Sequence, residues 1–171
     1  MKNNKLNIIL IISLFICYEC AAFKNKFLNN VDAPNKNELH TEIALSSTEK
    51  FDYSIIFIQF SYYKDRSDKK IILFFEKRNQ NITLPESLKF KCDEFRIKLS
   101  AINPDTRNTG QGRNKIITES LRSLITIEEL KAISLTQKCE VFIYGRISTD
   151  SFYLKNDGLH LIRKFLDSIE R

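Results

Sequence analysis

The sequence predicts an α+β domain: a mostly antiparallel sheet of about five or six strands, with two short helices and a C-terminal amphipathic helix packed on one face. Residues 139–169 read as a strand, a tight turn, a second strand and a helix. Residues 51–75 hold two apolar runs around a polar loop, which is typical of an antiparallel hairpin. The 171 residues include only 4 Gly and 3 Pro, which argues against a turn-dense all-β fold.

The first 22 residues have the organisation of a secretory signal peptide. Lys2 and Lys5 precede an apolar run at 8–16, which is too short for a bilayer span of about 20 residues. Cleavage after Ala22 would release a free secreted protein. Alternatively, the apolar run ends at Cys17, the place of the lipid-bearing cysteine in a lipoprotein signal, although Ile16 is bulkier than the residue usual there. We therefore expect a secreted protein or one lipid-anchored at the outer cell surface.

Residues 23–50 predict a flexible tether. They are rich in asparagine and offer few apolar residues to offset the entropy lost on ordering, with at most one helical turn around 38–45. The predicted organisation is a signal peptide at 1–22, a tether at 23–50 and a single α+β domain at 51–171.

This leader and the Asn/Lys-rich stretch behind it resemble the surface lipoproteins of spirochaetes. The resemblance covers about the first 50 residues and rests on composition. In those proteins a lipidated cysteine is followed by a disordered tether and a folded, partner-binding domain. The resemblance thus implies an outer-surface location, a binding role, and Cys17 as the lipid-bearing residue.

Within the domain, residues 55–58 are apolar on both faces, which favours a central strand, and residues 71–75 form its hairpin partner. Residues 88–92 and 95–101 alternate in opposite phases around Asp93-Glu94, which indicates either a β-bulge or a turn between two short strands. Apolar spacing at 116–124 suggests a short helix. Thr126 and Glu129 form a capping box that opens a second helix. Asn156-Asp157 can cap the C-terminal helix.

Residues 103–115 give the longest loop signal in the domain. Two glycines among basic residues could cradle an anion, and a solvated connector is the alternative. The residues of this candidate loop site are Arg107, Gly110, Gly112, Arg113 and Lys115.

Once the leader is removed, Cys92 and Cys139 are the cysteines that remain. Export permits a disulfide, and both lie in predicted strands, so they form either a bridge between neighbouring strands or two buried thiols. No metal site or cofactor is expected, because His40 and His160 are the only histidines and no Cys-x-x-Cys follows the leader.

No catalytic set emerges from the sequence. Asp157-Gly158-Leu159-His160 resembles the terminal block of SGNH-type esterases, but no glycine precedes Gly110 and the early Gly-Asp-Ser is missing. The formal charge of +6 comes without a dense basic block, which argues against nucleic acid as a partner. The leading interpretation is an exported, non-enzymatic protein that binds a host or envelope partner, with membrane contact only through a lipid. The alternatives are a small secreted hydrolase and a binder of anionic surfaces.

Overall fold

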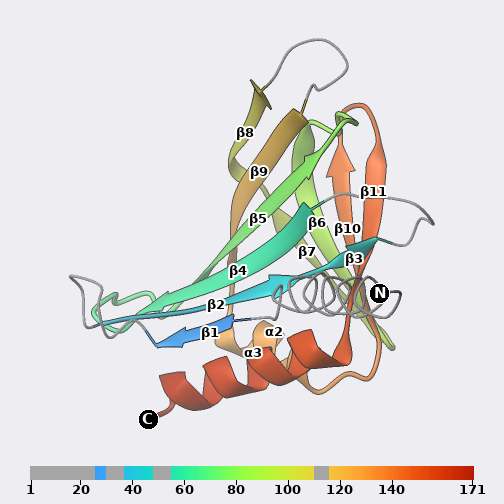
Figure 1. Cartoon of the computed structure of the whole chain (residues 1–171). Coiled ribbons are helices and arrows are strands. Elements are labelled where there is room, and N and C mark those ends of the chain that lie inside the picture. Colours follow the sequence, from blue (N-terminus) through green and yellow to red (C-terminus); the bar gives the residue numbers. More distant parts are fainter. Residues whose placement is uncertain (1–25, 30–36, 48–54, 110–115) are drawn as a thin grey trace, which may run out of the picture.

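The structure is a computed structural model that describes residues 26–29, 37–47, 55–109 and 116–171 (Figure 1). The predicted signal peptide, Cys17, Gly110, Gly112, Arg113 and Lys115 lie outside these residues. The strands are β1 (Lys26–Asn29), β2 (Glu38–Ala44), β3 (Ser46–Ser47), β4 (Ile55–Tyr63), β5 (Ile71–Asn79), β6 (Pro85–Cys92), β7 (Phe95–Ser100), β8 (Ile102–Thr109), β9 (Ile116–Ile125), β10 (Cys139–Gly145) and β11 (Thr149–Leu154). The helices are α2 (Ile127–Ser134) and α3 (Asn156–Ile169).

The strands form two antiparallel sheets instead of one. The first sheet has six strands in the order β1-β2-β4-β5-β9-β8, and the second has five in the order β3-β11-β10-β6-β7. The predicted mostly antiparallel sheet and C-terminal helix are confirmed. The predicted single sheet of five or six strands is wrong, and the described residues are predominantly β. The sequence predicts too few strands because three stretches that form strands carry patterns typical of a tether, a loop and a helix.

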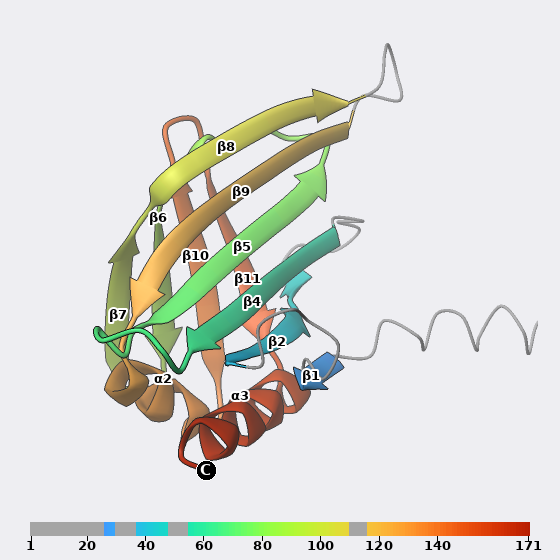
Figure 2. The same cartoon turned by 90° about the vertical axis from the view of Figure 1, so that its left-hand side faces the viewer.

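The chain passes from one sheet to the other at both edges. β2 pairs with β4 in the first sheet, and β3, which follows it directly, pairs with β11 in the second. At the other edge β7 pairs with β6, and β8, after Ala101, pairs with β9. The connections from β5 to β6 and, through α2, from β9 to β10 also change sheet. Together these crossings join the sheets into one sandwich, whose strands follow each other around the core in Figure 2.

The core lies between the sheets. Its fully buried side chains come from alternate positions of both sheets, as a two-layer β architecture requires: Ile58, Phe60, Leu73 and Phe75 from the first sheet, and Leu88, Phe90, Val141 and Phe152 from the second. Helices α2 and α3 lie together at one end of the sandwich (Figure 2). The rings of Phe165 on α3 and Phe60 on β4 are 6.4 Å apart, so the helix closes that end of the core.

The region predicted as a short helix, 116–124, is instead the ten-residue strand β9. Its inward positions are Ile117, Glu119, Leu121, Ser123 and Ile125, all buried. Two of the five are polar, and this interrupts the period-two apolar pattern. The remaining apolar residues, four apart at 117 and 121, imitate a helical face.

Two other local predictions are wrong. Residues 102–109 form the edge strand β8 and residues 38–44 form β2, whereas the sequence predicts a loop and at most a helical turn there. β8 is polar because its outer edge is unpaired in the described structure, and polar residues are the usual way to protect such an edge.

The phase change at 93–94 is a turn, not a bulge. Asp93, with φ of 42°, lies in a tight turn between β6 and β7.

Of the two predicted helix caps, one is confirmed and one is wrong. The capping box at the start of α2 is confirmed: Glu129 N–H donates to Thr126 Oγ1 at 3.1 Å, and Thr126 N–H donates to Glu129 Oε2 at 2.9 Å. The predicted cap of α3 is wrong, because the N-cap residue is Lys155 and its side chain makes no capping bond. Among the described residues, neither helix is long and apolar enough to cross a membrane.

Candidate functional site: the outer face of the five-stranded sheet

The outer face of the five-stranded sheet carries four basic side chains on two adjacent strands. Lys89 and Lys91 lie on β6, and Arg96 and Lys98 lie on β7. Their neighbours Leu88, Phe90, Ile97 and Leu99 point into the core, so strand alternation places the basic residues outside. We call these four residues the basic quartet.

The quartet is arranged so that like charges meet. In the register of β6 and β7, Lys89 lies opposite Lys98 and Lys91 lies opposite Arg96. Like charges directly opposite each other destabilise an antiparallel pair. Of the carboxylates on β6, β7, β10 and β11, that of Glu140 lies opposite Lys91, and that of Glu86, near the start of β6, pairs with Arg146 at 2.7 Å. Within the described residues, no member of the quartet takes part in an ion pair.

Aromatic rings lie beside the quartet on the neighbouring strands. Phe142 and Tyr144 on β10 stack with ring centroids 6.2 Å apart, and Tyr153 on β11 is 38% exposed. Lys89 Nζ lies 6.0 Å from the centroid of the Tyr144 ring, at the outer limit of a cation–π contact. One half of the face is therefore cationic and the other half aromatic.

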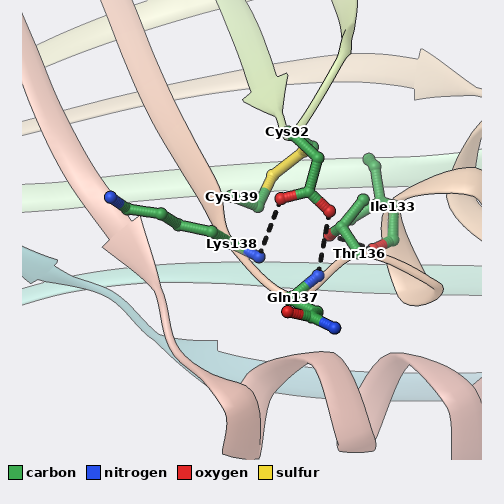
Figure 3. Close-up of a disulfide and its surroundings, with 7 residues drawn as sticks. Cys92, Ile133, Thr136, Gln137, Lys138 and Cys139 are labelled. Atoms are coloured by element: carbon green, nitrogen blue, oxygen red, sulfur yellow. Dashed lines mark hydrogen bonds between the residues drawn. A yellow bond between two sulfur atoms is a disulfide. The ribbon is translucent and has the colours of Figure 1, made fainter.

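A disulfide ties the two central strands of this face together, as predicted among the alternatives. Cys92 ends β6, Cys139 begins β10, and the two are opposite each other in the register (Figure 3). Next to the bridge, the Asp93 carboxylate accepts hydrogen bonds from the N–H groups of Gln137 (3.0 Å) and Lys138 (3.2 Å). The strand carrying Lys89 and Lys91 is thus covalently held to the strand carrying Phe142 and Tyr144.

The outer face of the six-stranded sheet is organised differently. There Arg78 pairs with Glu76 and Arg107 pairs with Asp105, each at 2.6 Å. Near the far edge the pKa of Tyr63 is raised, first by burial and then by its hydrogen bond to Glu38 and the negative charge of that residue. Arg78 and Arg107 are thus neutralised on this face, whereas no residue of the basic quartet takes part in an ion pair in the described structure.

Arg107 is the one residue of the predicted anion loop within the described residues. It lies on β8 and lines a surface pocket of about 430 Å³ together with Asp105, Phe74, Thr118 and Arg122. The positive charge of Arg107 is already paired with the Asp105 carboxylate, and a bound anion would have to compete with that carboxylate. The structure therefore places Arg107 on a strand next to a carboxylate.

A buried ionic cluster, which the sequence analysis missed, links the two sheets at the end away from the helices. Lys77 Nζ lies 2.8 Å from Glu119 Oε2 and 2.5 Å from Asp150 Oδ2, and Thr83 Oγ1 bonds to both Lys77 and Asp150. Glu119 Oε1 accepts from the N–H groups of Thr83 and Leu84 at 2.8 and 2.6 Å. The sequence does indicate that Lys77 points inward, because it continues the period-two row of Ile71, Leu73 and Phe75. One ammonium group faces two carboxylates, and the second of these, Asp150, is 26% exposed to solvent. With Lys77 and Glu119 each 1% exposed, the cluster fits a structural role.

Asp157 and His160 lie near the start of α3, and both side chains are exposed. Within the described residues no hydrogen bond links the two side chains, and no group of three or more potential metal ligands is found.

No protein-family model, curated protein or solved structure matches this chain.

Proposed function

We propose that this chain is an exported, non-enzymatic protein that binds an extracytoplasmic partner through the outer face of its five-stranded sheet. The protein is secreted or held at the cell surface, in the latter case by a lipid on Cys17. The observation that carries the proposal is the basic quartet, which keeps like charges opposed without ion pairs in the described structure. Such an arrangement costs stability, and a bound partner that neutralises it would offset the cost.

Two further features support a binding role. The leader has the basic and apolar segments of a secretory signal, and the bridge between Cys92 and Cys139 suits an oxidising compartment outside the cytoplasm. The bridge joins β6, which carries Lys89 and Lys91, to β10, which carries Phe142 and Tyr144, so the centre of the face is presented to a partner as a rigid surface. Preorganisation of this kind lowers the entropic cost of binding.

Lysine-reactivity mapping tests both parts of the proposal. Intact source cells and their culture medium are treated with a membrane-impermeant lysine reagent, and the modified positions are compared with those of the purified protein. We expect Lys70 and Lys164, exposed away from the face, to react equally in both samples. Lys89, Lys91 and Lys98 should be protected in the native sample only.

Either of two results would overturn the proposal. If no lysine of the protein reacts until the cells are broken, the protein is not exported to the surface or the medium. If all five lysines react as they do in the purified protein, the basic face carries no partner. Intact mass of the native protein separately reports cleavage after Ala22 or a lipid on Cys17.

A further inference from the structure

We infer that the partner of this face is an acidic polysaccharide, a glycan chain bearing sulfate or carboxylate groups. The inference rests on the proposed function and adds the chemical class of the ligand. It combines two observations from one surface: a square of four cations on β6 and β7 without ion pairs in the described structure, and a row of rings on β10 and β11.

The cationic half matches a repeating anion. Neighbouring strands are about 5 Å apart, and outward residues two apart on one strand are separated by about 7 Å. The basic quartet therefore forms a grid of four positive charges, whose backbone positions are about 5 Å apart across the strands and about 7 Å apart along them. A chain with regularly spaced anions can satisfy all four at once, whereas a single small anion would reach two at most.

The aromatic half matches a sugar ring. Tyr144 and Tyr153 are 36% and 38% exposed, and each offers a ring face together with a hydroxyl that can hydrogen-bond. Phe142 stacks on Tyr144 and is only partly exposed. A pyranose has an apolar C–H face and polar edges, so it can lie on such rings while its charged substituents reach the adjacent lysines.

Two other polyanions fit less well. Binding to an anionic membrane surface is strengthened by bulky apolar side chains that insert between lipids, and the most exposed aromatic residues of this face are tyrosines. Nucleic acid would satisfy the same cations and rings. It is the less favoured partner because the leader predicts a location outside the cytoplasm.

The test measures binding of the disulfide-intact protein to heparin, a sulfated polysaccharide, as a function of NaCl concentration. In the face variant, Lys89, Lys91, Arg96 and Lys98 are all changed to Gln. The matched control is K64Q/K70Q/K164Q/R171Q, which removes three lysines and one arginine at exposed positions away from the face. Both variants have the same net charge, so a purely non-specific attraction to heparin affects them equally.

We expect the face variant to lose at least about tenfold in affinity. The slope of log K against log salt concentration should be shallower by about 3. This is the change that counterion release, with the slope per contact known for nucleic acids, gives for four lost ion contacts. The control should retain the slope of the unchanged protein. Tyr144→Ala should weaken binding without changing the slope, because the ring contributes stacking and no charge.

Three outcomes would overturn the inference. Equal losses in the face variant and the control would mean that net charge alone is responsible. Tighter binding to a single-stranded oligonucleotide, or to vesicles containing 30% phosphatidylserine, would assign the face to another partner. No binding at about 50 mM NaCl to heparin, which carries both sulfate and carboxylate groups, would exclude an acidic polysaccharide, and protection of Lys89, Lys91 and Lys98 on cells would then still leave the proposed function standing. Circular dichroism and the intact disulfide mass verify that each variant is folded.

Discussion

Lys77 and Glu119 lie directly opposite each other on β5 and β9, with Nζ 2.8 Å from Oε2 and both side chains about 1% exposed. Asp150 reaches Lys77 from the facing sheet, so one ammonium group holds carboxylates from both layers. At the other end of the sandwich the same task is done by apolar contacts of α3. The fold is therefore closed by a polar cluster at one end and by a helix at the other.

Lys77→Met should destabilise the protein by about 3–5 kcal/mol. Removing one partner leaves the Glu119 charge buried without compensation, and the loss is much larger than the net value of the pair. Urea unfolding gives the free energy. Arg66→Met is the control, because Arg66 and Asp68 form an exposed ion pair at 2.7 Å and its loss should not measurably change the unfolding free energy. Similar effects of the two substitutions would show that the cluster is not buried as described.

Gly145→Ala should be more destabilising than Gly158→Ala. A Cβ at 145 would lie 2.0 Å from the carbonyl oxygen of Thr83, a backbone atom in the segment that supports the ionic cluster. A Cβ at 158 would meet side-chain methyl groups of Ile43 and Leu154 at 2.7 and 2.8 Å, which can give way more easily than a backbone carbonyl, and alanine favours the helix. We expect a loss of about 1–3 kcal/mol at 145 from urea unfolding. A larger loss at 158 would contradict the close approach of β10 to Thr83.

Breaking the Cys92–Cys139 bridge should cost about 4 kcal/mol, because the two residues are 47 apart and the bridge restricts a long loop of the unfolded chain. The measurement compares the urea midpoint of the oxidised protein with that of C92A/C139A. Heparin binding of the folded variant should persist at low denaturant, since the quartet itself is unchanged. Equal midpoints for the two proteins would mean that the cysteines are not joined.

Thr126→Ala should destabilise the protein by about 1 kcal/mol, because it removes the acceptor for the Glu129 N–H at the start of α2. Thr126→Ser keeps the hydroxyl and should cost clearly less. Thermal or urea unfolding of both variants distinguishes loss of the cap from loss of the methyl group. An equally large effect of serine would assign the stabilisation to packing.

Strands were predicted correctly over the stretches in which the inward residues are apolar without interruption. In β10 the inward residues are Cys139, Val141 and Ile143, and the opening of α2 has a side-chain signal of its own in Thr126 and Glu129. Prediction failed where tertiary context replaced an apolar residue with a polar one. Glu119 in β9 is tolerated inside only because Lys77, 42 positions earlier, lies opposite it, and a local pattern contains no information about that partner.

The face that carries the basic quartet could be predicted only in part from the sequence. The alternation of Lys89 and Lys91 with Leu88 and Phe90 is visible in the sequence. The register is not, and it is the register that places Lys98 opposite Lys89 and the rings of Phe142 and Tyr144 beside them. A binding surface of this kind is assembled from strands that are distant in sequence, whereas the loop at 103–115 attracts attention because its residues are contiguous.

Lys98→Glu should stabilise the fold and weaken binding at the same time. It replaces a like-charge pair with Lys89 by an opposite-charge pair, which is worth about 0.2–1 kcal/mol between antiparallel strands. The gain in unfolding free energy should fade at about 1 M NaCl, where the screening length falls to about 3 Å. Lys70→Glu, the same charge change in the exposed β4–β5 loop, should leave heparin affinity close to that of the unchanged protein. A lower free energy of unfolding for Lys98→Glu would show that Lys98 and Lys89 do not repel each other in the folded protein. Heparin affinity equal to that of Lys70→Glu would show that Lys98 does not contribute to binding.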